Sequence, residues 1–206
     1  MSQTPGSSSS QAGNASSHLE DLKARKADYE HAIGEMEKHL SVASDGTIVL
    51  DVKNAADIHV NPDAFDELGK SLQKVNTLLR INQLQPTQVG LKTDFGPSVV
   101  MEARITAAGS CPGIDHTYTY WWGHQIDLNE CQTQKLIADL QIGAGVAALV
   151  ALLTAALVPI AIIAGVIGAI MAIEQGVFQY YDQQCGHQGI AIYMTYFSDI
   201  PWAGCQ

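Results

Sequence analysis

Apolar side chains in the amino-terminal part of the chain recur at the spacing of amphipathic helices. Between residues 19 and 40, and again between residues 65 and 79, they follow one another at steps of three or four. This spacing places them on one face of an α-helix. Ser17 starts a Ser-x-x-Glu capping pattern before the first stretch, and Asn61 with Pro62 forms an N-cap and a first-turn proline before the second. These patterns predict two helices that each pack by one face.

Short strands are predicted where apolar and polar positions alternate or where β-favouring residues gather. Residues 47–52 alternate after an Asp-Gly turn, and residues 99–106 are a second candidate. In the carboxy-terminal half, residues 118–128 and 189–197 are rich in aromatic and aliphatic side chains, which favour strands. We expect each of these two runs to form one continuous strand.

The longest apolar stretch lies between these two strands. Residues 140–173 are thirty-four consecutive positions without an ionisable side chain, with Asp139 before them and Glu174 after them. One straight helix of this length would be about 50 Å long, whereas the hydrocarbon core of a bilayer is about 30 Å thick. Pro159, near the middle, has no amide hydrogen and interrupts helices. We therefore predict an apolar hairpin of two helices that breaks at Pro159.

Each arm of this hairpin has small residues at every fourth position. Such ridges allow helices to approach one another closely, in lipid as in a protein core. We expect the ridges to form the packing seam of the hairpin. The residues are Gly143, Ala147, Ala151 and Ala155 in the first arm, and Ala161, Gly165 and Ala169 in the second.

Together the patterns predict an α+β fold that is mainly helical. An apolar two-helix hairpin is flanked by two aromatic β-strands and preceded by a small helical domain. We divide the chain into a disordered Ser/Gly-rich tail (1–17), a helical amino-terminal domain with a short strand (18–84), a linker with a possible strand (85–110) and a disulfide-clamped hairpin domain (111–206).

Four cysteines bracket the apolar stretch, two on each side. Their even number favours disulfides, for which three pairings are possible. The nested pairing joins Cys131 to Cys185 and Cys111 to Cys205 and would clamp the base of the hairpin, so we expect this pairing. Disulfides in turn indicate an oxidising location.

The chain is acidic, with 21 Asp and Glu against 11 Lys and Arg and a formal net charge of −10. Nucleic acid requires a basic surface, so this charge excludes it as a partner. A carboxylate resists burial when it is ionised and much less when it is protonated. We therefore expect Asp139 and Glu174 to act as a pH gate that eases entry of the hairpin into lipid at acid pH.

The sequence contains none of the common catalytic motifs. It has no phosphate-binding glycine loop, no H-E-x-x-H and no G-x-S-x-G. We predict that the protein is not an enzyme and uses no cofactor. A zinc site of Cys131, Cys185, His124 and His187 is an alternative to the disulfides, but no paired C-x-x-C spacing supports it, so no metal is expected.

Aromatic residues gather near the base of the hairpin rather than within its arms. An interfacial belt at a membrane surface has this distribution. The alternative is that the rings pack a small sheet onto helices. The residues of the expected belt are Tyr120, Trp121, Trp122, Tyr180, Tyr181 and Trp202.

These observations favour a membrane-active protein, a pore-forming toxin or bacteriocin-like effector, whose hairpin inserts into a target bilayer. In outline, residues 140–173 resemble the hydrophobic hairpins of pore-forming colicins and the apolar helices of circular bacteriocins, in composition and without a shared motif. That resemblance implies membrane entry. The chain departs from it in being acidic, where bacteriocins that act on anionic membranes are commonly basic, and in lacking a recognisable receptor or translocation module.

Two other functions stay open. The first is a secreted or surface structural protein that self-associates and keeps the hairpin as a buried core. The second is a two-span protein resident in its own membrane. The expected partners are a lipid bilayer and a second copy of the chain. Because the amino terminus has no charged segment followed by an apolar core, we expect delivery by a route without a signal peptide.

Overall fold

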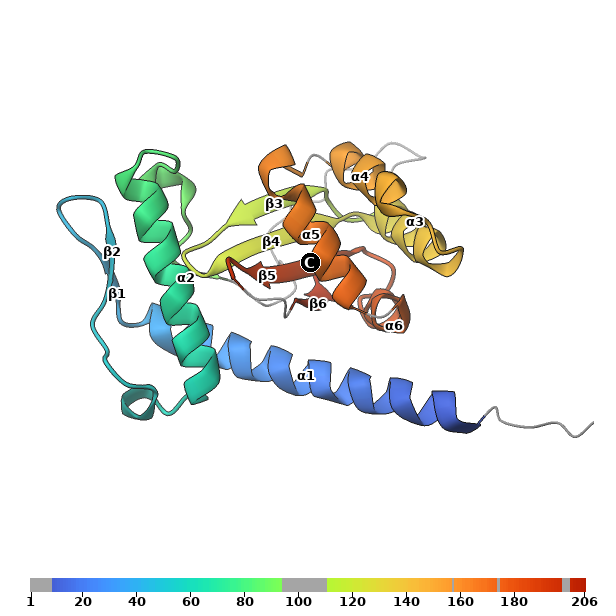
Figure 1. Ribbon diagram of the computed structural model, residues 1–206, viewed down its shortest axis with the longest axis horizontal. Coiled ribbons are helices and arrows are strands. Elements are labelled where there is room, and N and C mark those ends of the chain that lie inside the picture. Colours follow the sequence, from blue (N-terminus) through green and yellow to red (C-terminus); the bar gives the residue numbers. More distant parts are fainter. Residues whose placement is uncertain (1–8, 94–110, 157, 174, 198–200) are drawn as a thin grey trace, which may run out of the picture.

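A computed structural model describes residues 9–93, 111–156, 158–173, 175–197 and 201–206. These residues form six α-helices and two antiparallel sheets, so the predicted α+β class is confirmed (Figure 1). In chain order the elements are α1 (Ser9–Glu37), β1 (Leu40–Val42), β2 (Ile48–Leu50), the 3-10 helix η1 (Ala55–Ile58), α2 (Pro62–Arg80), η2 (Pro86–Gln88), β3 (His116–Thr119), β4 (Gly123–Leu128), α3 (Glu130–Gln141), α4 (Val146–Ala155), α5 (Ile160–Ala172), α6 (Gln175–Gln184), β5 (Ile190–Thr195) and β6 (Trp202–Cys205).

The helix α1 begins before the capping pattern at Ser17. It starts at Ser9, so residues 9–17, which were predicted to belong to the disordered tail, are helical instead. Helix propagation adds one hydrogen bond for each residue, and nothing between residues 9 and 17 breaks the helix. Farther along α1, Ile33 and Met36 are buried, as the apolar spacing predicts.

The helix α2 begins where the sequence predicts. The side chain of Asn61 accepts hydrogen bonds from the amides of Asp63 and Ala64, which completes the N-cap. Asn76 then joins α2 to the small β1–β2 hairpin, because its amide bonds both the N–H and the C=O of Ile48 at 2.7 Å. The predicted strand at 99–106 lies outside the described residues.

The larger sheet has the order β3-β4-β5-β6, and every neighbouring pair is antiparallel. The prediction of one strand over 118–128 is wrong, because the chain reverses between β3 and β4. Tyr120 and Gly123 exchange backbone hydrogen bonds of 2.8 and 3.3 Å at the turn. Gly123 is required there, since a Cβ would lie 2.0 Å from the carbonyl oxygen of Met194. Aromatic residues favour a strand and a hairpin equally, so composition did not reveal the turn.

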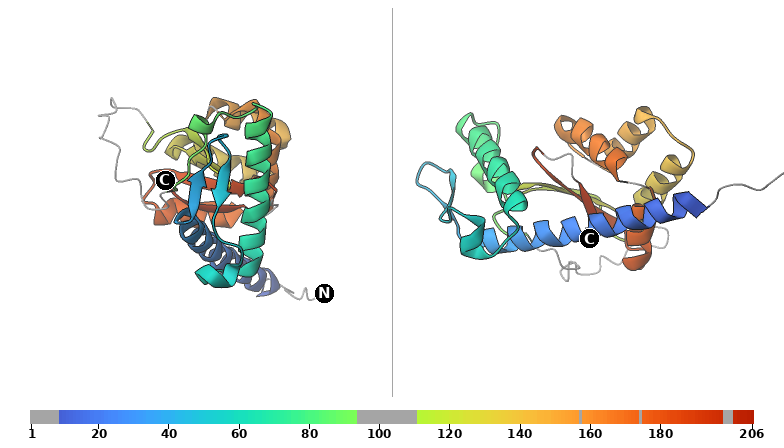
Figure 2. Two further views of the ribbon diagram at one scale, coloured as in Figure 1. Left: turned by 90° about the vertical axis from the view of Figure 1, so that its left-hand side faces the viewer. Right: turned by 60° about the horizontal axis from the view of Figure 1, so that its bottom comes forward.

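Four helices, α3 to α6, lie in sequence between the paired strands β4 and β5. A simple two-helix hairpin flanked by aromatic strands is therefore not confirmed. Gly143, with φ of 66°, lies between α3 and α4, and Pro159 is the N-cap residue of α5. The right-hand view of Figure 2 shows α4 and α5 above the sheet and α1 below it.

The two faces of the larger sheet belong to two core clusters. Ile190 and Ile192 pack with α3 to α6, whereas Ala191 and Tyr193 pack with α1, η1 and α2. Alternate residues of a strand point to opposite faces, which explains this division. Residues from both predicted domains thus share the second cluster, and the domain boundaries themselves stay a prediction.

The cysteines form two disulfides, but the predicted nested pairing is wrong. Cys111 is bonded to Cys131 and Cys185 to Cys205, with Cα atoms 5.5 and 5.3 Å apart. Strand order decides this pairing, because β6 lies beside β5 and brings Cys205 opposite Ile190, close to the end of α6. The zinc alternative fails, since both of its cysteines are in disulfides. The disulfides fit an oxidising, extracellular-like location.

Candidate membrane-facing surface

The inner faces of α4 and α5 are held in the protein core. Leucines and isoleucines at steps of three and four face the sheet and pack against α3 and α6. Each such side chain gains about 1.5 to 3 kcal/mol when it is fully buried. The buried residues are Leu149, Leu152 and Leu153 in α4, and Ile163, Val166, Ile167, Ala169 and Ile170 in α5.

The outer faces of the same two helices are also uncharged. Ile142, just before α4, is 79% exposed, and Ile160, the first residue of α5, is 84% exposed. Val146 and Met171 are exposed as well. Thr154 is the polar exception, and its hydroxyl donates to the carbonyl of Val150. Surface helices normally present charged or polar side chains to water, so this face differs from an ordinary solvated one.

The predicted ridges of small residues lie mainly on this outer face. Gly143, Ala147, Ala151 and Ala155 are exposed, as is Ala161. Ala169 is buried, and a Cβ on Gly165 would lie 3.0 Å from the side chain of Met194, on the sheet side of α5. The ridges therefore do not form the expected seam between α4 and α5. Leu and Ile gain more from burial than Ala and Gly do, so the helices turn their larger side chains inward.

The aromatic residues are core residues rather than an interfacial belt. Trp121 and Trp122 are fully buried, and Trp202 and Tyr181 are nearly so. Tyr120 and Tyr180 are half-buried. The rings of Tyr120, Trp122 and Trp202 form a continuous stack between the sheet and the amino-terminal elements. The alternative of rings that pack a sheet onto helices describes this arrangement.

The predicted pH gate is described only in part. Asp139 lies in α3, half-buried, and one of its carboxylate oxygens is buried without a hydrogen-bond partner. Glu174 lies outside the described residues. The gate therefore stays a prediction.

Two titratable side chains of β4 were not recognised from the sequence as pH-sensitive groups. His124 is opposite Met194, which packs in the cluster of α4 and α5, so His124 faces these helices. Burial lowers the pKa of His124 to about 4. Asp127 faces the other side of the sheet, and burial raises its pKa to about 6 although Gln125 donates a hydrogen bond to it. Alternate residues of a strand point to opposite faces of the sheet, so the positions of His124 and Asp127 in β4 could have assigned each side chain to its face.

The helices are short relative to a bilayer. Within the described ranges, no single helix is long and apolar enough to span a bilayer. Only α5 and α6 together have the required length and hydropathy, and this pair is bent by 91°. A helix of ten residues such as α4 is about 15 Å long, roughly half of the hydrocarbon thickness.

Comparison with protein-family models, with curated proteins and with solved structures gives no match for this chain.

Proposed function

We propose that this protein is membrane-active and that the outer faces of α4 and α5 bind the bilayer. The observation that supports this proposal is an uncharged exposed surface on two neighbouring helices, with Val146, Ile160 and Met171 at its large apolar positions. Exposed Ile142 lies in the turn between α3 and α4. Transfer of an exposed isoleucine into the apolar part of a bilayer gains about 1.5 to 3 kcal/mol. Few such side chains are needed for reversible binding.

The preferred lipid is electrically neutral. The net charge of −10 opposes attraction to anionic headgroups. Lys135 is the single lysine or arginine after residue 111, so α4, α5 and their flanking segments carry no basic stripe of their own. Binding by this surface is therefore hydrophobic and independent of anionic lipid.

Deeper insertion, as in a pore-forming toxin or bacteriocin-like effector, requires α4 and α5 to leave the sheet. Neither disulfide joins these helices to another element, so both bonds can stay intact during this change. Acid favours it, because a proton on His124 places a charge in the core beneath α5. Protonation of Asp139 and Glu174 acts in the same direction.

Flotation with phosphatidylcholine vesicles tests the proposed surface. Ile160→Asp places a negative charge at the start of α5, and Met171→Lys places a positive charge in its last turn. The helix dipole favours both charges, so both variants should fold. Each variant should bind vesicles at least tenfold more weakly than the wild type at pH 7, because 1.4 kcal/mol corresponds to a factor of ten. Ile81→Lys, at an isoleucine that is 55% exposed beside the end of α2, is the matched control and should bind normally.

Equal binding by all four proteins would exclude α4 and α5 as the contact surface. The same preparations should release vesicle-trapped dye faster at pH 5 than at pH 7. Binding without release at either pH would leave a peripheral membrane protein and contradict pore formation.

A second candidate function is self-association, which the exposed ridge of Gly143, Ala147, Ala151 and Ala155 favours, since small residues let a helix of another copy approach closely. This function predicts a dimer that forms in a concentration-dependent manner and does not bind vesicles. Sedimentation of the wild type and of Ala151→Leu distinguishes it, because the larger side chain should prevent dimer formation.

A further inference from the structure

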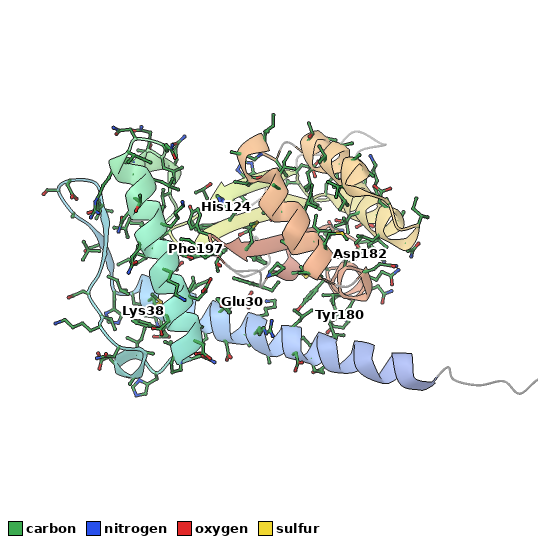
Figure 3. The ribbon with its side chains drawn as sticks, viewed as in Figure 1. Glu30, Lys38, His124, Tyr180, Asp182 and Phe197 are labelled. Atoms are coloured by element: carbon green, nitrogen blue, oxygen red, sulfur yellow. A yellow bond between two sulfur atoms is a disulfide. The ribbon has the colours of Figure 1, made fainter. Side chains whose placement is uncertain are left out.

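A polar cluster joins α3 to α6 away from the apolar face. Glu130 is the first residue of α3, Asp182 is in the last turn of α6, and His187 follows α6. The imidazole Nδ1 of His187 lies 2.9 Å from Asp182 Oδ2 and 3.5 Å from Glu130 Oε1. All three side chains thus offer a ligand atom within 4.8 Å of the other two. Figure 3 labels Asp182 on its helix.

The two carboxylates of this cluster are incompletely satisfied. Asp182 is only 3% exposed, yet its Oδ1 has no hydrogen-bond partner, and neither has Oε2 of Glu130. Among the described residues their ion-pair partner is His187, and no lysine or arginine joins them. Two neighbouring carboxylates in a buried position are costly without a compensating positive charge. Unless His187 is protonated, the cluster has no positive charge to compensate the two carboxylates.

We propose that Glu130, Asp182 and His187 form a binding site for one divalent metal ion of the Zn²⁺ class. One imidazole nitrogen and two carboxylate oxygens suit Zn²⁺ better than Ca²⁺ or Mg²⁺, which prefer oxygen ligands alone. Ligand atoms arranged tetrahedrally at about 2.1 Å from zinc are about 3.4 Å apart. The separations of 2.9 and 3.5 Å from His187 are close to this value.

A fourth position is open to Gln134 or to water. The amide nitrogen of Gln134 lies 2.8 Å from a carboxylate oxygen of both Glu130 and Asp182. A half-turn of this amide brings its oxygen to the same place as a ligand. A surface hollow of about 320 Å³, lined by Gln134, Asp182 and His187 among others, leaves room for water instead. The bound metal fastens α3 to α6, the two helices that precede and follow α4 and α5 in the chain.

Calorimetric titration of the chelator-treated, oxidised protein with ZnCl₂ tests the site. We expect saturable binding of one ion for each chain, and a higher melting temperature in the presence of Zn²⁺ but not of Ca²⁺. His187→Asn should bind zinc at least tenfold more weakly. Asn is the chosen residue because it tolerates the left-handed backbone at His187, where φ is 57°.

His59→Asn is the matched control. His59 is also exposed and left-handed, with φ of 56°, but lies after η1 and outside the cluster. The His59→Asn variant should bind zinc as tightly as the wild type does. Glu130→Gln should weaken binding as His187→Asn does, with thermal unfolding in chelator confirming that each variant folds. Absence of saturable binding, unchanged affinity in His187→Asn, or an equal loss in His59→Asn would overturn the proposal. This result is independent of vesicle binding, since none of these residues is in the apolar face.

Discussion

Helices α2 and α4 bury similar surfaces but present different surfaces to water. Leu68 in α2 and Leu152 in α4 are both fully buried at the centre of an apolar stripe. The solvent side of α2 carries Asp66, Lys70 and other polar residues, as an ordinary amphipathic helix does. The solvent side of α4, continued by α5, carries no charge. The inward faces therefore account for folding, and the outward faces distinguish a structural helix from a candidate binding surface.

The largest effect is expected where the two helices are alike. Leu68→Ala and Leu152→Ala each leave a cavity in a closed core and should lower the free energy of unfolding by about 2 to 5 kcal/mol. Chemical denaturation with both disulfides intact measures the two losses. A loss below about 1 kcal/mol for Leu152→Ala alone would mean that α4 packs only weakly against the core. The buried faces of α2 and α4 would then not be equivalent.

The two faces of β4 supply a pH test of comparable size. The unfolded chain binds a proton on His124 below pH 6.5, whereas the folded protein binds it only near pH 4. Unfolding should therefore become easier as the pH falls through this range, by about 3 kcal/mol in all. Asp127 acts in the opposite sense: the folded protein keeps its proton up to about pH 6 and the unfolded chain up to about 3.8. The contribution of Asp127 to the free energy of unfolding therefore falls by about 3 kcal/mol as the pH rises through this range.

Because these two contributions oppose each other, they should largely cancel in the wild type from pH 4 to pH 6. Asp127→Asn leaves His124 alone, so stability should rise with pH. His124→Gln leaves Asp127 alone, so stability should fall with pH. Denaturation curves at several pH values measure the slopes. Parallel slopes in the two variants would contradict the burial of one or both groups.

A smaller effect is expected at the helix starts. Asn61→Ala removes the side-chain cap of α2 and should cost about 1 kcal/mol. Gly145 is the N-cap residue of α4, with extended backbone angles and open space around the position of a Cβ. Gly145→Asn should therefore add a cap and stabilise by a few tenths of a kcal/mol. Thermal unfolding measures both changes, and destabilisation by Gly145→Asn would show that this position does not accept a cap.

Local patterns in the sequence predicted much of the amino-terminal half, because one face of each helix there is polar. The N-cap at Asn61 and the buried positions of α1 and α2 follow from such patterns. In α4 and α5 periodicity identified residues that share a face, but with both faces apolar it did not reveal which face is buried. The small ridge of the first arm was therefore assigned to the wrong side.

Long-range contacts account for the remaining errors. The disulfide pairing depends on β6 lying beside β5, which cysteine spacing does not reveal. The turn between β3 and β4 depends on the close approach of Gly123 to the backbone of β5. The cluster of Glu130, Asp182 and His187 forms only because α3 packs on α6.

Hydrogen exchange followed by mass spectrometry, with and without phosphatidylcholine vesicles at pH 7, tests whether the outer face of α4 and α5 binds the bilayer. It compares α4 and α5 with α2 in one sample and requires no substitution. We expect vesicles to slow exchange over residues 142–172 and to leave exchange over residues 62–80 unchanged. Unchanged exchange over 142–172, or equal slowing in both regions, would contradict the assignment of the outer face of α4 and α5 as the membrane-binding surface.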